Sequence, residues 1–236
     1  EGKAEYPFPE WNVWGGDKTR KLKEGTGFFS TCKTPDGRWH LTDPEGCDYF
    51  SLGPCGTRAG EWGRIDSFEN CCEWLPEEDA QYAEFFEEGS RRRTAYMPVD
   101  HYRMANFSGM NLKKIYGDDW KEKWEEISCH ILMNNGINSQ GNFPGIAVNN
   151  GRSKMAYVRE LPDFPVTDTL IFRDFPDVLS PEYEEKSRIY AEKLEEWKHD
   201  PWLIGYFLRN EPEFNFVENL AIADEVLRNP AQTFCR

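Results

Sequence analysis

An amide and a carboxylate, Asn210 and Glu211, stand directly after an apolar run near the end of the chain. The run WLIGYFL, residues 202–208, predicts a strand that is buried on both faces, as the strands of a parallel sheet are. In α/β barrels the C-terminal ends of the strands form the active-site face. A carboxylic acid there can donate a proton to a leaving oxygen and later accept one from water, while the amide holds a hydroxyl group. The alternative is that Glu211 caps the next helix, where its charge would favour the helix dipole.

The elements that must position this pair alternate between strands and helices. A hairpin comes first, with strands at residues 28–33 and 38–42 around a Pro-Asp-Gly turn. After it the chain predicts strand, helix, strand, strand, helix and strand, which is the order of βα units and implies a parallel sheet. The four strands are predicted at residues 49–53 (YFSLG), 137–142 (INSQGN), 156–161 (AYVREL) and 203–211 (LIGYFLRNE).

Two helices between these strands carry clear end signals. Asp119 is placed to cap the first, with Glu122 three residues later completing a capping box, and Gly136 follows as the expected C-terminal stop. Ser180 is placed to cap the second helix, whose first turn holds Pro181. Both helices carry apolar residues at helical spacing along one face, as expected of helices that cover a sheet.

Less regular sequence separates the first strand from these helices. Residues 77–88 are acidic and predict a helix, and residues 89–109 predict an irregular segment. That segment contains Arg91-Arg92-Arg93, which is either a solvated surface or a site for an anionic sugar. Asn106 begins an Asn-Phe-Ser sequon in the same segment and is the candidate for glycosylation.

The composition excludes several kinds of partner. Of 236 residues 42 are acidic and 28 are basic, which gives a net charge of −14. Such a chain lacks the Lys and Arg clusters that nucleic acid requires, and anionic membranes repel it. No apolar run approaches the roughly 20 residues of a membrane span. Nine Trp and ten Tyr residues suit a core or the faces of sugar rings, so a neutral substrate fits this chain better.

The seven cysteines bear on the cellular compartment rather than on metal binding. None has zinc-finger or Cys-x-x-Cys spacing, so neither a metal site nor a cofactor is predicted. The chain opens on Glu1 instead of Met, which we interpret as processing or trimming. A secreted protein would hold most of these cysteines oxidised, with one left free or paired to another chain. They are Cys32, Cys47, Cys55, Cys71, Cys72, Cys129 and Cys235.

Four segments, read in order, resemble the beta-agarase-like glycoside hydrolases, which belong to a clan of retaining glycosidases built on (β/α)8 barrels. The segment with the DPEG turn and the segment that begins DPWLIGYF are fairly specific together, whereas NEP alone is common to much of the clan. The similarity runs from about Trp14 to Pro212. The segments are GRWHLTDPEGCDYFSLG (37–53), GINSQGN (136–142), FPDVLSPEYEE (175–185) and DPWLIGYFLRNEP (200–212).

The resemblance assigns roles to individual residues. In that clan an Asn-Glu pair ends the fourth barrel strand, the Glu acting as general acid/base and the Asn contacting the sugar 2-hydroxyl. Carried over, these are Glu211 and Asn210. Asn142 and Arg58, near the ends of the second and first strands, are candidates to line the sugar site, with loop stabilisation as the alternative role for each. The implied substrate is a poly- or oligosaccharide with β-glycosidic bonds, of an agarase or galactosidase kind, and no cofactor is implied.

One part of the family pattern is missing. Retention of configuration needs a second carboxylate about 5–5.5 Å from the acid, and in the clan that nucleophile ends the seventh strand. A full barrel takes about 250 residues, whereas this chain reaches Arg236 about one helix after its fourth strand. We therefore expect a (β/α)8 barrel of which only strands 1–4 are present, with residues 1–46 as an N-terminal extension and β-hairpin packed on the barrel and residues 47–236 as its first half.

The expected partner is a C-terminal half-barrel, present as a second chain or as sequence missing here, and the expected location is secreted or extracellular. Two other interpretations stay open. The chain could be a catalytically inactive barrel that acts as a carbohydrate-binding or structural extracellular glycoprotein. It could also be an intact small α/β protein in which Glu211 only caps a helix.

Overall fold

The computed structural model describes residues 5–57, 60, 62–66, 68–91, 100–145, 154–161, 163–215 and 221–228. The chain divides into two compact units, each built from segments that are distant in sequence. Unit 1 comprises Glu1–Phe8, Cys55–Ile137 and Pro144–Met155, and unit 2 comprises Pro9–Pro54, Asn138–Phe143 and Ala156–Arg236.

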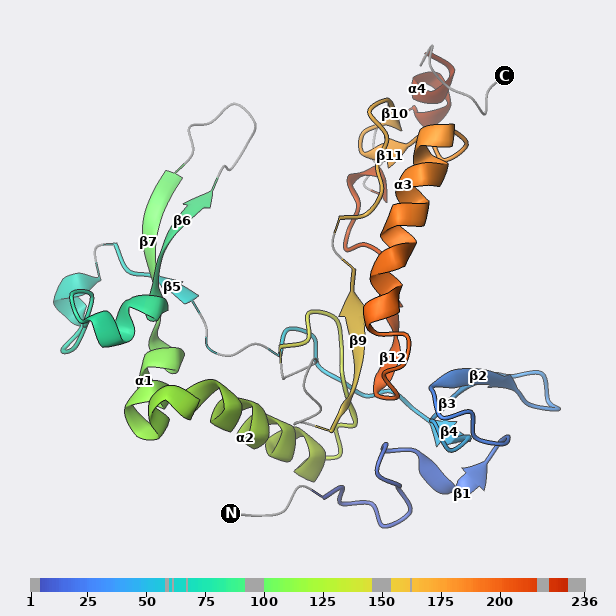
Figure 1. Cartoon of the computed structure of the whole chain (residues 1–236), viewed down its shortest axis with the longest axis horizontal. Helices are drawn as coiled ribbons and strands as arrows, with labels where there is room; N and C mark the ends of the chain where they lie inside the picture. The colour runs from blue at the N-terminus through green and yellow to red at the C-terminus, as the bar shows by residue number, and fades with distance from the viewer. Residues whose placement is uncertain are drawn as a thin grey trace. The chain divides into compact units, whose positions relative to one another are not determined.

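Unit 1 combines a small antiparallel sheet with two consecutive helices (Figure 1). The strand order is β5-β7-β6, and the core contains Ile65, Phe85, Met110 and Trp120. The strands are β5 (Trp62–Arg64), β6 (Phe86–Arg91) and β7 (Asp100–Asn106). The helices are α1 (Phe107–Tyr116) and α2 (Trp120–Asn134), with 3-10 turns η1 (Glu69–Cys71), η2 (Ala80–Phe85) and η3 (Gly117–Asp119).

The predictions for residues 77–109 were wrong. The expected acidic helix is the short 3-10 turn η2, which Asp79 caps by accepting a hydrogen bond from the Gln81 amide. The expected irregular segment contains most of the β6–β7 hairpin, in which Phe86 pairs with Ala105. Local propensity failed here because cross-strand pairing and the burial of Phe85 decide the conformation. Residues 92–99, with two of the three consecutive arginines, lie outside the described residues.

The helix α2 confirms the prediction of a helix that ends before Gly136, whose φ is +76°. The predicted capping box at Asp119 was wrong, because the Asp119 side chain makes no capping hydrogen bond. The chain enters α2 from the 3-10 turn η3, so Asp119 has φ −82° and ψ 9°. That conformation is not the extended one in which a side chain reaches back to the first amides of a helix.

Unit 2 begins with a four-stranded antiparallel sheet of order β1-β4-β3-β2. The predicted hairpin is confirmed: β2 and β3 pair from Ser30↔Thr42 to Lys33↔Trp39. Its turn needs a glycine, because Gly37 has φ +86°. The strands are β1 (Asp17–Lys21), β2 (Ser30–Lys33), β3 (Trp39–Thr42) and β4 (Cys47–Tyr49).

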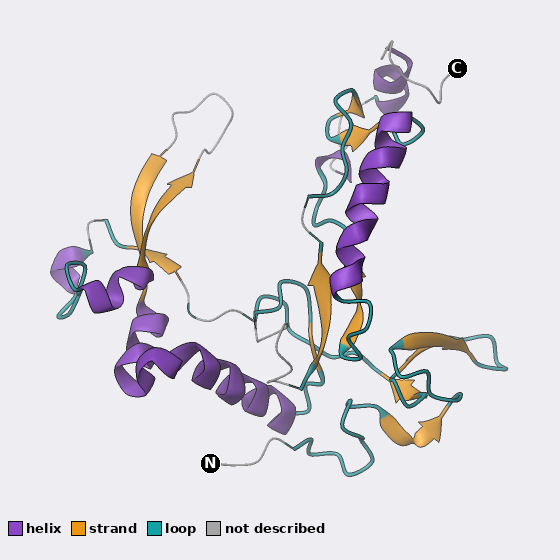
Figure 2. Cartoon of the chain, in the orientation of Figure 1, coloured by secondary structure: helices purple, strands orange, loops and turns teal. Residues whose placement is uncertain are grey.

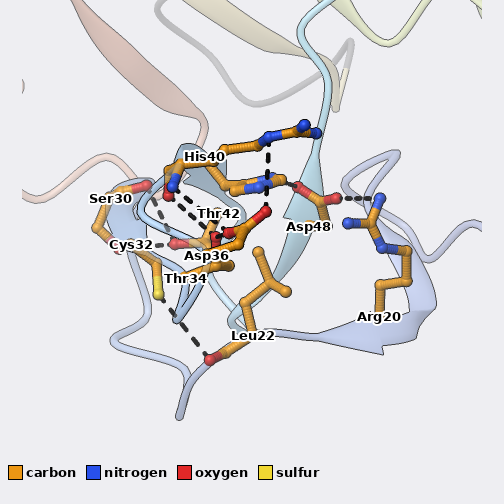
Figure 3. A network of polar contacts seen from close by, with 10 residues as sticks. Arg20, Leu22, Ser30, Cys32, Thr34, Asp36, His40, Thr42 and Asp48 are labelled. Carbon is orange, nitrogen blue, oxygen red and sulfur yellow. Dashed lines mark hydrogen bonds and ion pairs between the residues drawn. The ribbon is translucent and has the colours of Figure 1, made fainter.

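Polar contacts join the strands of this sheet (Figure 3). The Asp48 carboxylate on β4 contacts His40 Nδ1 on β3 at 2.9 Å and Arg20 Nη1 on β1 at 2.6 Å. The Ser30 and Thr42 hydroxyls lie 3.1 Å apart across the β2–β3 pair. These contacts link all four strands in the order in which they pair, so the sheet is specified by polar side chains as well as by its turns.

The second part of unit 2 is a three-stranded parallel sheet of order β12-β9-β8. Helix α3 lies in the chain between β9 and β12, and its C-terminal turns approach the ends of these strands (Figures 1 and 2). Its N-cap prediction is confirmed, because Ser180 Oγ accepts a hydrogen bond from the Tyr183 amide. A hairpin, β10–β11, lies between β9 and α3. The bounds are β8 (Ser139–Gln140), β9 (Ala156–Glu160), β10 (Leu170–Phe172), β11 (Phe175–Pro176), α3 (Pro181–Glu192), η4 (Lys193–Glu196), β12 (Leu203–Phe207), η5 (Glu213–Asn215) and α4 (Ile222–Arg228).

The predicted first strand at residues 49–53 is only partly correct. Tyr49 ends β4 of the antiparallel sheet, and the next residues are not a regular strand. They nevertheless follow β8 in a parallel sense, because Leu52 O accepts from the Ser139 amide at 3.2 Å and Pro54 O accepts from the Gly141 amide at 2.8 Å. The segments therefore lie in the sequential order 50–54, β8, β9 and β12.

The described residues have mixed α/β structure in small, open sheets and form no closed barrel. The predicted (β/α)8 barrel is therefore not observed, since the parallel sheet ends in an edge at β12 and the remaining three sheets are antiparallel. The division at residues 46 and 47 stays a prediction. Within unit 2 the segment before β1 contacts the segment before β12, because the centroids of the Trp14 and Trp202 rings lie 4.1 Å apart.

Two expectations about the compartment can be compared with the described residues. No disulfide joins the cysteines there, so the expected oxidation finds no support, and Cys235 lies outside them. None of the described helices has the length and apolar character needed to cross a lipid bilayer.

Candidate active site

The polar residues that follow the parallel strands of unit 2 lie at one end of the sheet, where the C-terminal ends of its strands meet. The β9–β12 pairing runs from Leu203↔Tyr157 to Phe207↔Glu160 and continues with a 2.9 Å bond from the Leu161 amide to Phe207 O. Because the C-terminal ends of parallel strands lie at the same end of a sheet, the residues after β8 and those after β12 lie at that end. Asn142 follows β8, and Asn210 and Glu211 follow β12. Arg58 lies outside the described residues.

Asn142 is buried at this edge, with 4% of its surface exposed. Its Oδ1 atom has no hydrogen-bond partner among the described residues. Leaving a buried acceptor unpaired costs roughly 1–3 kcal/mol, so such groups in folded proteins call for an explanation in terms of a bound ligand, a water or a functional role. A hydrogen-bond donor from a ligand or a water would satisfy this atom.

Asn210 and Glu211 are both exposed. Glu211 has φ +39°, in the left-handed region that costs a residue other than glycine about 1–2 kcal/mol. Strained backbone of this kind is concentrated at active sites and ligand clamps. The conformation turns the chain sharply after the strand and directs it into the 3-10 turn η5.

A carboxylate that sequence reasoning missed holds this turn. Asp174, in the β10–β11 hairpin, accepts hydrogen bonds from the Glu213 and Phe214 amides at 2.9 and 2.7 Å and pairs with the Arg209 guanidinium. The amides at the start of η5 are therefore bonded to Asp174, and Glu211 does not cap them. The sequence gives no signal for Asp174, because its 35-residue separation from Arg209 carries no periodicity.

Helix α3 fixes the ends of the two strands that precede the turn. The Tyr190 hydroxyl lies 2.8 Å from Leu208 O and 3.3 Å from Leu161 O, so it can donate to either carbonyl oxygen. Burial is the largest cause of the raised pKa of Tyr190, which keeps the hydroxyl protonated as a donor. The strand end that carries Asn210 is thus attached to a helix whose own start is capped by Ser180.

Strand β12 is less buried than its sequence predicts. Its first four residues are half-buried, and the exposed fractions of Phe207 and Leu208 are 43% and 56%. An apolar strand of a parallel sheet normally has both faces covered. The described chain therefore leaves an apolar edge directly before Asn210 and Glu211.

Asn106, the glycosylation candidate, lies in unit 1 and is 3% exposed. Its Oδ1 accepts a 2.7 Å hydrogen bond from the Gly109 amide and caps α1. Glycosylation at Asn106 stays a prediction, and it would require the Asn106 amide to leave this buried environment.

Comparisons with known proteins confirm a likeness to agarases. No family model matches the chain. In sequence it is 25% identical over 245 residues to Beta-agarase B of Vibrio sp. (strain JT0107), a match that covers 92% of this chain and 25% of the relative. The chain thus spans about a quarter of the length of this curated relative.

Solved structures show the same likeness in three dimensions. PfGH50B superposes with a TM-score of 0.70 at 26% identity, over 90% of this chain and 33% of that protein. The agarase AgWH50C gives 0.67 at 21% identity, over 88% of this chain and 32% of its own. An exo-beta-agarase gives 0.66 at 23% identity, over 88% and 34% of the two chains. The fold of this chain is therefore that of about one third of each of these proteins.

Proposed function

We propose that the chain is part of a glycoside hydrolase that cleaves β-glycosidic bonds in an agar-type poly- or oligosaccharide. The observation that carries the proposal is the Asn210-Glu211 pair at the end of a parallel strand, in a chain similar to agarases over nine tenths of its length. A neutral sugar chain also suits the net charge of −14 better than an anionic substrate.

Glu211 is the general acid/base of this proposal. Its carboxylic acid protonates the glycosidic oxygen as the bond from that oxygen to the anomeric carbon breaks. A second carboxylate attacks the anomeric carbon and forms a glycosyl-enzyme ester, so the configuration is retained overall. Glu211, now a carboxylate, then takes a proton from the water that hydrolyses the ester and returns to its starting state.

Asn210 and Asn142 bind the sugar. Asn210 offers an exposed amide beside the acid and contacts the 2-hydroxyl. Asn142 offers the buried Oδ1 atom that lacks a partner in the described structure, which suits a hydroxyl donor. Arg58 is kept as a further sugar-binding candidate near the end of the first parallel segment.

The nucleophile and the rest of a (β/α)8 barrel lie outside these 236 residues in this proposal. Two observations support it: the four parallel segments follow one another in sequence order, and the edge strand β12 leaves Phe207 half-exposed. The relatives are also three to four times longer than their matched part. The remaining half would cover β12 and place a carboxylate about 5–5.5 Å from Glu211. The proposal includes secretion, because a polysaccharide substrate would be cleaved outside the cell.

The test is Glu211→Gln in the whole protein that contains this chain. We expect kcat on an agar-derived oligosaccharide to fall at least about 10²-fold, the lower range for loss of a general acid. An aryl glycoside with a dinitrophenol leaving group needs little protonation, so its first step should be affected much less. The matched control is Glu213→Gln, which neutralises an exposed carboxylate in the same turn and should leave kcat within a factor of about two.

Two results would contradict the proposal. If Glu211→Gln hydrolyses the natural substrate at the wild-type rate, Glu211 is not the acid. If the wild-type protein binds the oligosaccharide but does not hydrolyse it, the inactive carbohydrate-binding barrel is the better interpretation.

A further inference from the structure

We propose that Asp174 is a positioning residue for the reaction: it fixes the turn that carries Glu211. We call residues 209–214 the Glu211 turn. The inference rests on the proposed function, in which Glu211 is the acid/base, and adds the device that sets its orientation. Asp174 comes from the β10–β11 hairpin, which sits between β9 and α3 in the chain.

One carboxylate joins both ends of the turn. Asp174 Oδ2 contacts the Arg209 guanidinium at the start and accepts from the Glu213 amide at 2.9 Å near the end. Its Oδ1 accepts from the Phe214 amide at 2.7 Å. The Asp174 side chain is only 17% exposed, so these bonds are largely shielded from water. Asn210 and Glu211 lie between the two anchored ends.

The Glu211 turn needs such an anchor. Glu211 adopts φ +39°, a conformation that persists only where surrounding contacts over-determine it. The side chain of Glu211 is exposed, whereas the Glu213 and Phe214 amides both donate to Asp174. Charge-assisted hydrogen bonds to a carboxylate are the strong kind, which suits them to hold a strained turn in one geometry.

The hairpin that presents Asp174 is itself packed against the turn. The Phe175 and Phe214 rings meet edge to face with centroids 5.0 Å apart. Arg173 Nη1 donates to Glu213 O at 3.3 Å. The base of the hairpin is closed by a 2.9 Å bond from the Asp177 amide to Thr167 Oγ1. Asp174 therefore lies on a hairpin that several contacts hold in place, as a positioning residue requires.

The test is Asp174→Asn in the whole protein. Asparagine keeps the size of the side chain, but its amide nitrogen cannot accept a hydrogen bond, so the turn loses at least one anchor. We expect kcat on the natural oligosaccharide to fall roughly 10²-fold, as a displacement of about 1 Å can cause, with KM almost unchanged. The loss on the dinitrophenyl glycoside should be several-fold smaller, because a misplaced acid matters less when the leaving group needs no proton.

Three further measurements separate positioning from a general structural effect. Asp168→Asn is the matched control, since Asp168 precedes the same hairpin but its side chain is 92% exposed; it should leave kcat unchanged. Amide hydrogen exchange of the Glu213 and Phe214 amides should accelerate in Asp174→Asn and not in Asp168→Asn. In a protein that already carries Glu211→Gln, adding Asp174→Asn should lower kcat by less than a further threefold, because the carboxylic acid that Asp174 positions is already removed.

The outcomes are distinguishable. Equal losses on both substrates, or a full additional loss in the Glu211→Gln background, would show that Asp174 acts on stability and would overturn the inference alone. Unchanged kcat in Asp174→Asn would also overturn it. If Glu211→Gln lowers kcat equally on the two substrates, the proposed function is wrong, and Asp174 then only stabilises the Glu211 turn.

Discussion

Asn138 is the side chain on which the order of the parallel segments in unit 2 depends most directly. It is fully buried, and three of its hydrogen bonds go to backbone groups. Its Oδ1 accepts from the Leu52 amide at 2.8 Å, and its Nδ2 donates to Gly15 O at 3.1 Å and to Phe50 O at 2.9 Å. The residue thus attaches residues 50–54 to the start of β8 and both to the N-terminal part of the unit.

The change Asn138→Ala removes all three bonds and leaves their backbone partners without this side chain. At about 1 kcal/mol for each bond, the loss is about 3 kcal/mol, and the unpaired buried groups add to it. Since about 1.4 kcal/mol corresponds to a factor of ten, local opening should become roughly 10²-fold more frequent. The structure cannot repair the loss by moving Gly15 closer, because Gly15 already lies so near that a Cβ on it would be 2.5 Å from the Asn138 Cβ.

Hydrogen exchange of two amides measures this opening. The Ser139 and Gly141 amides donate to Leu52 O and Pro54 O, groups that the substitution does not touch. Their exchange should therefore accelerate only if the two segments separate. The control is Asn135→Ala, which removes a single exposed bond to Ile131 O and should change exchange at these amides by less than threefold. Equal protection in both variants would refute the role of Asn138.

Two more predictions concern the Tyr190 hydroxyl and the cysteine thiols. Tyr190→Phe removes the hydroxyl that contacts Leu208 O and should lower stability by about 1 kcal/mol, measured by urea unfolding. Because burial raises the folded-state pKa of Tyr190, its contribution is complete below the ordinary tyrosine pKa of about 10 and is lost as pH rises above it; the phenylalanine variant should lack this alkaline loss. Thiol titration after denaturation without reductant should find at least six reactive cysteines, because six form no disulfide in the described structure; two or fewer would instead fit the oxidised cysteines expected of a secreted protein.

The sequence predicted those elements whose signals are local. The hairpin is defined by its Pro-Asp-Gly turn, and the start of α3 by the Ser180 cap followed by Pro181, so the hairpin strands and the start of α3 were predicted close to where they are observed. The β6–β7 hairpin was missed because Phe86 and Ala105 pair over a distance in sequence that no periodicity reveals. The apolar run at residues 49–53 predicted a strand, yet only the hydrogen bonds that Leu52 O and Pro54 O accept from residues 138–141 show a parallel arrangement.

The residues of the candidate site also differ in whether a local sequence signal indicates them. Asn210 and Glu211 were predicted because they interrupt an apolar strand, and Asn142 because it follows another, so the neighbours of each residue in sequence indicate it as a candidate. Asp174 has no such mark: it is one acidic residue among 42, in a turn between two short strands. A residue that acts by holding another segment can be recognised only when the fold brings the two segments together.

The two interpretations of Glu211 differ in the partner that each gives to the amides at the start of η5. A capping glutamate would have to accept from those amides, because they are the unpaired donors at the start of the turn. In the structure the Glu213 and Phe214 amides donate to Asp174, while Glu211 stays exposed in a left-handed conformation. In the proposed function, a carboxylate that does not accept from these amides, exposed after the C-terminal end of a parallel strand, is available to a ligand. This placement, in a chain that matches agarases over most of its length, favours the general acid over the helix cap.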